Sequence, residues 1–483
     1  MRTPPPLAPA TPRDDGSPII RNTPDLLSHG NVAGRRVVLD ILEAGLRASD
    51  PYDHVRRLVR IEDGKLRVGG EGLADGRSSP PLVFDLAEVG HIYVTGGGKA
   101  AQRQAEALED VLGDRIDGGH VNAKKGDTVR LKRIGVTLAG HPLPDEDSVE
   151  GSKQIVEWEQ RARKGDIVFH SESGGGSALM TLPAPGVTLE DLKDVNRLLY
   201  FERGASMWDT NAVRNMLVLL RSREVRYAGE ATFIQLSTDE RPPRMRIEVG
   251  RRQHLHLPAS DAYEYAIGVL KAYGCWERVS DAVRRFLLNA DPAYGPLTAE
   301  ERARMHYYRV IGPETMLEAA ERRARELELH ATIVASSLSD VEAAAAGNVL
   351  AYMAQECELH ERPLPTPSVL ICGGELVVTV GSAKGSGGRN QEFALSMAPR
   401  IAGSARIVAA SADSDGSDGP TERAGGIVDG LTMERLAAVG VDYFASMAEH
   451  DSEGALREIG DTFDTGVRGT NVQDLRVVYV ASG

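Results

Sequence analysis

Three glycine-rich loops constrain the fold of this chain most. Each follows an apolar run and precedes a segment with helical spacing of its apolar residues; they occupy residues 92–101, 168–180 and 377–395. Strand-sized apolar runs that alternate with helical segments are typical of βαβ units and predict a mainly parallel sheet. Glycine also lets the backbone approach a ligand closely, and helix N-termini offer N–H groups, so loops of this kind suit anions.

The chain is long enough for at least two domains, because 483 residues exceed what one ordinary core serves. The strand–helix alternation occurs twice, and a largely helical stretch at about 258–329 separates the two regions. We predict a proline-rich disordered tail (1–23), an N-terminal α/β domain with the helical stretch (24–329) and a C-terminal α/β domain (330–483). Both domains are expected to be Rossmann-like, with mainly parallel sheets. Ligands of such folds bind beyond the carboxyl ends of strands, so the expected active site is a cleft between the domains.

Hydrophobic periodicity supplies the individual elements. A D-G turn between alternating segments predicts a hairpin at 57–70, and residues 368–381 are expected to form a strand, a turn and a second strand. The other expected strands are 91–97, 165–173, 231–239, 331–337, 406–416 and 475–482, and the expected helices include 25–49, 99–113, 188–206, 341–358, 389–402 and 431–440.

Composition limits the partners and the compartment. The formal net charge is −14 and no basic stripe is evident, which argues against a nucleic-acid partner. The sequence contains no run of 18 apolar residues, so we predict no membrane span, and the N-terminus lacks the apolar region of a signal peptide. Three separate cysteines without a C-x-x-C pair fit a reducing cytoplasm rather than a disulfide framework or a zinc site. We expect a cytoplasmic protein with small-molecule partners, and leave homo-oligomer formation open.

Lys99 is the first candidate for phosphate chemistry. It follows Gly96, Gly97 and Gly98 directly at the end of an expected strand. A lysine in the first turn of a helix can point back at a phosphate held on such a loop. The sequence is neither a P-loop nor a G-x-G-x-x-G fingerprint, so a nicotinamide site has no direct support. The alternative is a solvated lysine on a helix face.

The second loop offers amides and hydroxyls. It consists of Ser173, Gly174, Gly175, Gly176 and Ser177. Phosphate capture is favoured over nucleophilic catalysis, because a serine hydrolase would want G-x-S-x-G with a paired histidine and aspartate. His141 and His170 would serve as bases only by chance of folding.

Arg389 follows Gly387 and Gly388 at the start of an expected helix, and Lys384 precedes it in the same loop. Arginine binds phosphoryl oxygens in a bidentate manner and neutralises charge that develops on them. The alternative is a structural arginine paired with Glu392.

Acidic residues crowd the loop after residue 411. Asp413, Asp415, Asp418 and Asp429 lie in or just after a Gly/Pro-rich turn. Mg²⁺ usually takes one or two carboxylates and lets substrate phosphates complete its shell, so Asp415 and Asp418 are candidate ligands. Solvated turn aspartates are an equal alternative. His254 and His256 lack an evident third ligand and are expected to be surface or core histidines.

Several motifs together resemble one family. GHPLPDEDSVEGS, SGGGSALMTLPAPGVTLEDL, NAVRN, GGELVVTV, GGRNQEFAL, DSDGSDGPTERAGGIVDG and GTNVQDL stand in this order. They are similar to those of the type II glycerate 2-kinases, whose C-terminal portion is the MOFRL domain, and the likeness runs from about Asn31 to the C-terminus. It implies ATP- and Mg²⁺-dependent phosphorylation of the 2-hydroxyl of D-glycerate, with a nucleotide and a hydroxy acid as partners.

The resemblance also implies roles for single residues. The family's essential lysine falls on Lys99 and its essential arginine on Arg389. The serine–glycine loop maps to 173–177. The N-x-V-R element gives Asn211 and Arg214, and the G-G-E element gives Glu375.

Several stretches depart from the family pattern. A lysine and two glycines are replaced by Arg221, Ser222 and Arg223. A strand that usually ends in S-D-V-x-G-D here ends in LSTDERPPR, which leaves Asp239 as a displaced carboxylate and third metal candidate. Three functions therefore stay open: a glycerate 2-kinase; a kinase for a longer or more anionic acid, met by residues such as 251 and 252; and a catalytically weak homologue that binds a nucleotide or an organic acid. Older family labels mention hydroxypyruvate reductase, which lacks support without a dinucleotide fingerprint.

Overall fold

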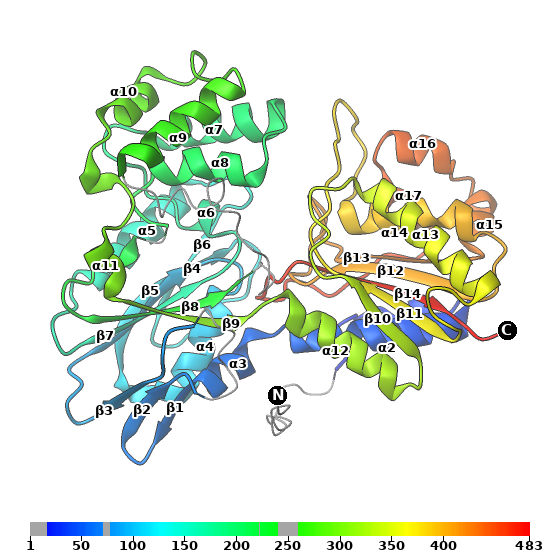
Figure 1. Ribbon diagram of the computed structural model, residues 1–483, viewed down its shortest axis with the longest axis horizontal. Helices are drawn as coiled ribbons and strands as arrows, with labels where there is room; N and C mark the ends of the chain where they lie inside the picture. The colour runs from blue at the N-terminus through cyan, green and yellow to red at the C-terminus, as the bar shows by residue number, and fades with distance from the viewer. Residues whose placement is uncertain (1–16, 71–77, 222, 240–258) are drawn as a thin grey trace. The chain divides into compact units, whose positions relative to one another are not determined.

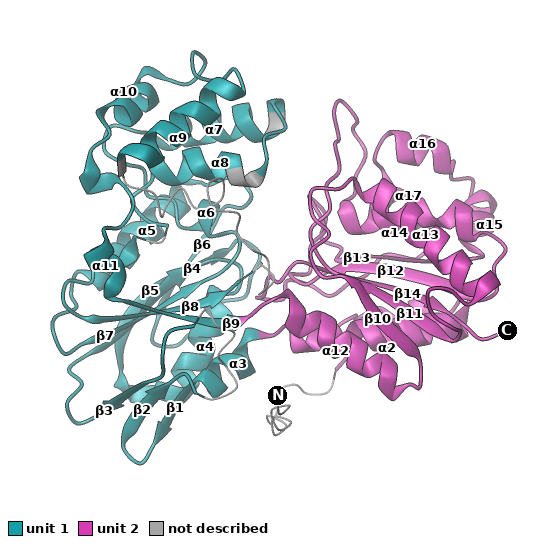
Figure 2. Cartoon of the chain, viewed as in Figure 1, with its two compact units in different colours: residues 1–8, 51–239, 243–310 teal, residues 9–50, 240–242, 311–483 magenta. Residues whose placement is uncertain are grey.

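The chain divides into two compact units (Figure 2). The computed structural model describes residues 17–70, 78–221, 223–239 and 259–483. Of these, unit 1 contains residues 51–239 and 259–310, and unit 2 contains residues 17–50 and 311–483. No helix among the described residues is long and apolar enough to cross a membrane.

Unit 1 is built on a six-stranded sheet (Figure 1). The strand order is β6-β5-β4-β7-β8-β9, and every pair from β6 to β8 is parallel. The two central strands, β4 and β7, are almost entirely buried, as expected for a parallel sheet covered on both faces. The large parallel sheet predicted for the N-terminal half is therefore confirmed. The bounds are β4 Ile92–Gly97, β5 Ile116–Lys124, β6 Gly135–Ala139, β7 Ile167–Glu172, β8 Thr232–Thr238 and β9 Met305–Ile311.

The register of this sheet aligns the ends of its strands. Gly97 pairs with Asn122 on one side and with Glu172 on the other, and Glu172 pairs with Ser237. The loops after β5, β4, β7 and β8 therefore all begin at one edge. This edge carries the first two glycine-rich loops.

The remaining elements of unit 1 flank the sheet. The predicted hairpin is present as β1 and β2, joined by β3 in a small antiparallel sheet. Helices α7 to α10 pack around a hydrophobic core of their own, distinct from the sheet (Figure 1). The bounds are α3 Pro51–Leu58, β1 Val59–Glu62, β2 Lys65–Val68, β3 Leu82–Asp85, α4 Ala101–Leu112, α5 Glu146–Glu159, α6 Gly176–Leu179, α7 Leu189–Asn196, α8 Met207–Arg214, α9 Ala259–Ala272, α10 Asp281–Asn289 and α11 Ala299–Ala303.

Unit 2 has a five-stranded sheet that corrects the sequence prediction. Its order is β10-β11-β14-β12-β13, and only β10 and β11 are parallel. The sheet is mixed rather than mainly parallel, because the last strand inserts between β11 and β12 and runs antiparallel to both. The bounds are β10 His330–Ala335, β11 Ser368–Cys372, β12 Ile407–Asp413, β13 Gly425–Asp429 and β14 Asp474–Val480.

Two local predictions also differ from the structure. The second strand expected within 368–381 is reduced to an isolated bridge between Val377 and Glu342. The stretch expected to be helical up to residue 329 contains β9, which adds to the edge of the unit 1 sheet. The helices of unit 2 are α1 Thr23–Leu26, α2 Val32–Ala48, α12 Pro313–Glu326, α13 Ala343–His360, α14 Arg389–Ile401, α15 Thr432–Ala438, α16 Tyr443–Ala448 and α17 Ser452–Glu458.

Helix α2 belongs to unit 2 although it lies far from it in sequence. The fully buried Arg35 donates to Asp429 at 2.6 Å and to Asp461 at 2.6 Å. The division by units therefore differs from the predicted boundary at 329: residues 17–50 and α12 join the C-terminal half. Ile20, in the stretch expected to be disordered, is 1 % exposed. The rest of the predicted tail, 1–16, lies outside the described residues.

Candidate active site

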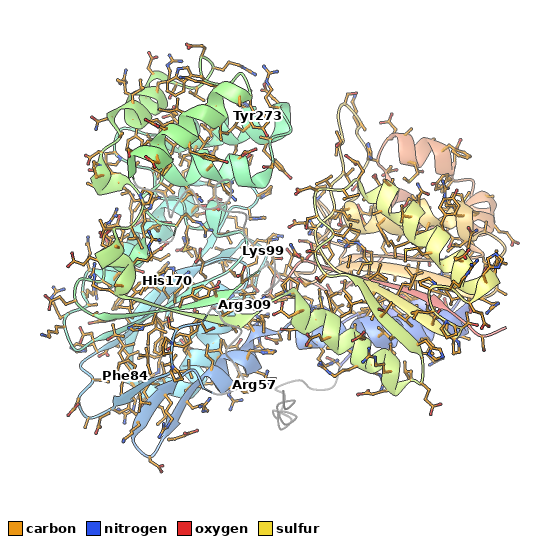
Figure 3. All side chains as sticks on the ribbon, viewed as in Figure 1. Arg57, Phe84, Lys99, His170, Tyr273 and Arg309 are labelled. Atoms are coloured by element: carbon orange, nitrogen blue, oxygen red, sulfur yellow. The ribbon has the colours of Figure 1, made fainter. Side chains whose placement is uncertain are left out.

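Lys99 lies just beyond β4 at the carboxyl edge of the unit 1 sheet (labelled in Figure 3). Its amide donates to the carbonyl of Gly174 at 2.9 Å, and the next amide, of Ala100, donates to Ser173 Oγ at 2.8 Å. These bonds join the first glycine-rich turn to the second. The Lys99 side chain is half-buried and, like His141, lies against Gly175.

The glycines before Lys99 let β4 approach its neighbour closely. A Cβ atom on Gly96 would come within 2.0 Å of the Ser171 carbonyl oxygen, and one on Gly98 within 2.3 Å of Ser173 Oγ. A Cβ atom on Gly97 would lie 2.3 Å from Met180 Cγ. Their small size therefore serves protein packing, which brings Lys99 to the serine–glycine loop.

The serine–glycine loop exposes backbone donors. Gly175 adopts φ +82°, a conformation that favours glycine, and turns the chain from β7 into the short helix α6. Within the described part of the chain, the amides of Gly174, Gly175 and Ser177 make no hydrogen bond to protein. The loop can therefore donate to an anion, which is the chemistry predicted for it.

The N-x-V-R element places a buried cation in unit 1. Arg214 is 7 % exposed and donates to the side-chain oxygens of Asn211 and of Asn196, the latter at 3.1 Å. Burial and the nearby guanidinium of Arg221 lower the pKa of Arg214 below its ordinary value. Its charge is therefore poorly compensated.

Two other candidates in unit 1 are held by protein partners. Asp239, just beyond β8, is buried, with Tyr307 Oη 3.5 Å and Arg309 Nε 3.9 Å from Oδ2. His170 is fully buried inside β7 (labelled in Figure 3), and its Nδ1 lies 3.2 Å from Glu159 Oε1. His170 is thus a core residue rather than a base on the loop.

Arg389 in unit 2 sits within three carboxylates. Its Nε is 2.8 Å from Asp474 Oδ2, its Nη2 is 2.7 Å from Asp413 Oδ2, and its Nη1 is 2.8 Å from Glu375 Oε1. Burial alone would lower the pKa of Arg389. The three carboxylates raise it by more than burial lowers it, so the net shift of the pKa is upward. The alternative partner, Glu392, is bound instead by His450 Nδ1 at 2.8 Å.

The elements of unit 2 explain this cluster. Asp413 ends β12 and Asp474 begins β14, and the two are paired across the sheet. Glu375 follows β11 after a Gly-Gly turn, and Arg389 opens α14. Neighbouring Arg476 also donates to Asp474 Oδ2, at 2.6 Å. The charges therefore fix one another's positions.

The acidic loop is engaged by the protein. Asp418 is fully buried and accepts from the amide of Gln391 at 2.8 Å and of Asn390 at 3.1 Å, so it caps α14. Burial raises the pKa of Asp418 to about 6, although these amides and Arg389 act against it. Gly388 is required beside it, since a Cβ there would lie 2.3 Å from the carboxylate. A Cβ atom on Gly387 would likewise lie 2.1 Å from Ser452 Oγ.

The other aspartates of this loop have protein donors as well. Asp415 Oδ1 accepts from the Ser417 amide at 2.8 Å, and Asp429 accepts from Arg35. Among the described residues, no group of three or more His, Cys, Asp or Glu side chains could hold a metal ion. Residues 251, 252, 254 and 256, named above, lie outside the described residues.

Sequence reasoning missed some members of the site. Asp474 and Arg476 lie in a terminal strand whose pattern signals only burial. Arg221 is visible in the sequence as a departure from the family, but no sequence signal shows that its side chain lies against Gly176 of the serine–glycine loop.

Family models, known proteins and solved structures match this chain. Two family profiles match, a domain of unknown function (DUF4147) over residues 37–237 and the MOFRL family over 368–474. A glycerate 2-kinase of Pyrococcus horikoshii is 35% identical over 454 residues, which cover 92% of this chain and 99% of that relative. The chain belongs to the glycerate 2-kinase family. A crystal structure of a glycerate kinase from Thermotoga maritima superimposes with a TM-score of 0.71 at 30% identity, covering 92% of this chain and 99% of that one.

The residues around Lys99 and those around Arg389 each lie in one of the two matched regions. Lys99 and the serine–glycine loop lie within the first matched region, and Arg389, Glu375 and Asp413 within the second. The family resemblance found in the sequence and the α/β class are thereby confirmed.

Proposed function

We propose that this protein transfers the γ-phosphoryl group of ATP to the 2-hydroxyl group of D-glycerate and forms 2-phosphoglycerate. The observation that carries the proposal is the placement of the family's two cations. Lys99 lies beside three amides that have no acceptor among the described residues, and Arg389 is oriented by three carboxylates. Both occur in a chain that matches a glycerate 2-kinase over nearly its whole length.

Phosphoryl transfer asks a protein mainly for positioning and for neutralisation of charge. Lys99 and the amides of Gly174, Gly175 and Ser177 supply both at the carboxyl edge of the unit 1 sheet. Backbone donors in such a loop do not need to reorganise when charge moves on to the phosphoryl oxygens.

Arg389 is proposed to stabilise the transferring group. A guanidinium has five N–H donors. Asp474 and Asp413 occupy Nε and Nη2, and their side chains are at most 3 % exposed. Glu375, beside Nη1, is 45 % exposed. We therefore assign the Nη1 side of Arg389 to a phosphate oxygen, with the two aspartates holding the guanidinium in place.

Mg²⁺ is proposed to arrive with the nucleotide. The described residues do not form a ready-made cage for it, which fits the usual binding of Mg²⁺ through phosphates and one or two carboxylates. We keep Asp415 and Asp239 as proposed contributors. Asp418 is the weaker candidate, because both its carboxylate oxygens accept hydrogen bonds from backbone amides of α14.

The proposal is tested by a screen for ATP consumption with Mg²⁺ against three- to six-carbon hydroxy acids. Turnover of D-glycerate is the expected result. Turnover of a longer acid alone would replace the substrate assignment. Thermal stabilisation by ligands without any turnover would indicate a binding protein and contradict the proposal.

A further inference from the structure

The Arg221 side chain lies against Gly176 of the serine–glycine loop. A Cβ atom on Gly176 would come within 2.2 Å of Arg221 Nη1, so the guanidinium lies directly against this position. The same nitrogen is 3.0 Å from Glu172 Oε1, at the end of β7. Arg221 stands where the family pattern has a lysine, but a guanidinium is planar and presents paired donors.

Hydrogen bonds hold the Arg221 amide and the Arg223 side chain. Arg221 has φ +70°, and its amide donates to Glu224 Oε1 at 2.7 Å. Arg223, which is 1 % exposed, donates to the carbonyl oxygens of Val218 at 2.6 Å and of Leu220 at 2.8 Å. The two arginines therefore differ in role: Arg223 binds backbone carbonyl oxygens, and the Arg221 side chain is directed at the serine–glycine loop.

Arg214 provides a second cation, whose charge interacts with that of Arg221. Its hydrogen-bond partners are neutral amide oxygens, and its buried Nε makes no hydrogen bond within the described part of the chain. No carboxylate among the described residues pairs with it. A buried charge without a counter-ion is unfavourable, so an anion at this point would stabilise the unit.

We propose that Arg221 and Arg214 bind the carboxylate of the acid substrate beside the serine–glycine loop, an inference that rests on the proposed function. The two guanidinium groups and the Glu172 carboxylate sum to one positive charge, which suits a monoanionic carboxylate. The planar donors of an arginine also match a carboxylate in a bidentate manner. Arg221 thus determines the preference for an acid over a neutral alcohol.

The test compares Arg221→Gln and Arg221→Lys with the wild type. Steady-state KM values for D-glycerate and ATP are measured, together with the Kd of D-glycerate by calorimetry without nucleotide. We expect Arg221→Gln to raise the KM and Kd for D-glycerate about 10- to 100-fold, the range of one lost charge-assisted hydrogen bond, and to leave the KM for ATP within about twofold. Arg221→Lys should recover part of the loss. The control is Arg226→Gln, which should leave the KM and Kd for D-glycerate unchanged, because Arg226 lies in the same segment but its Nε is 2.7 Å from Glu301 Oε1.

The outcomes separate this inference from the proposed function. Unchanged D-glycerate affinity in folded Arg221→Gln would overturn the inference while the kinase activity stood. A raised KM for ATP instead would place the pair at the nucleotide phosphates and also overturn it. If the wild type binds D-glycerate through Arg221 but transfers no phosphoryl group, the carboxylate site stands and the proposed reaction falls. D-Glyceramide, which lacks the carboxylate, should bind wild type and Arg221→Gln equally weakly.

Discussion

Replacement of Arg389 should separate its two roles, in stability and in catalysis. Arg389→Ala leaves Asp413, Asp474 and Glu375 facing one another without their shared cation. Breaking a buried ion pair costs about 3–5 kcal/mol, and the Arg389 side chain is only 19 % exposed. For a unit of this size each 1 kcal/mol shifts Tm by about 2–4 °C. We therefore expect Tm to fall by roughly 6–20 °C.

The catalytic loss should exceed the loss in folded protein. If Arg389 neutralises the transferring group, kcat measured well below the lowered Tm should fall at least about 100-fold. Arg389→Lys should be more stable than Arg389→Ala but also slow, because one ammonium cannot span all three carboxylates. Calorimetry gives Tm, and a coupled assay of ADP release gives kcat.

Arg435 offers a matched control. Its side chain is also 19 % exposed, and it donates to the buried Asp461 at 2.8 Å. Arg435→Ala should lower Tm in the same direction while kcat stays within about twofold. A near-normal kcat for Arg389→Ala, or an equal loss of kcat in both variants, would refute the catalytic assignment.

Three other parts of the molecule can be tested by single substitutions. Lys99→Ala should lower kcat at least about 100-fold with little change in Tm. Lys125→Ala is the control and should leave kcat unchanged, because Lys125 lies at the same sheet edge but its Nζ is 2.6 Å from two aspartates. Equal kcat values for the two variants would contradict the role of Lys99. Burial lowers the pKa of His120 to about 4, so the free energy of unfolding should fall by up to about 3 kcal/mol as pH drops from 6.5 towards 4. Urea titrations should show a flatter pH dependence of this free energy for His120→Gln. An unchanged pH dependence in the variant would disprove the role of His120. Arg35→Ala should lower the free energy of unfolding of unit 2 by about 3–5 kcal/mol in the same urea titrations. A decrease below about 1 kcal/mol would show that the ion pairs of Arg35 do not hold α2 in this unit.

Local patterns are sufficient for the parts of the site that depend on consecutive residues. The β4 strand, its three glycines and Lys99 follow one another in the sequence, and the serine–glycine loop follows β7 in the same way. Parallel pairing then brings the two loops to one edge, because parallel strands end together. This part of the site is therefore predictable from the sequence alone.

The surroundings of Arg389 could not be predicted in this manner. Its carboxylates come from three segments, at residues 375, 413 and 474, and meet only because β14 inserts antiparallel between β11 and β12. Sequence periodicity reports burial of a strand but not its neighbours or direction. Helix spacing favours a pairing of Arg389 with Glu392, but His450 binds that carboxylate instead.

The membership of α2 in unit 2 is hidden from the sequence for the same reason. Its amphipathic pattern predicts a helix, but the buried partners of Arg35 lie about 400 residues away, at Asp429 and Asp461. Contacts at that separation depend on the whole fold.

The most direct test of the account is the identity of the product formed from D-glycerate. Purified protein is incubated with ATP, Mg²⁺ and D-glycerate, and the product is examined by proton-coupled ³¹P NMR. A phosphate on the 2-hydroxyl couples to one proton and gives a doublet, and we predict this signal for the wild type and its loss in Lys99→Ala and Arg389→Ala. A triplet from phosphate on the terminal CH₂, or a doublet that persists at full rate in both variants, would contradict the account.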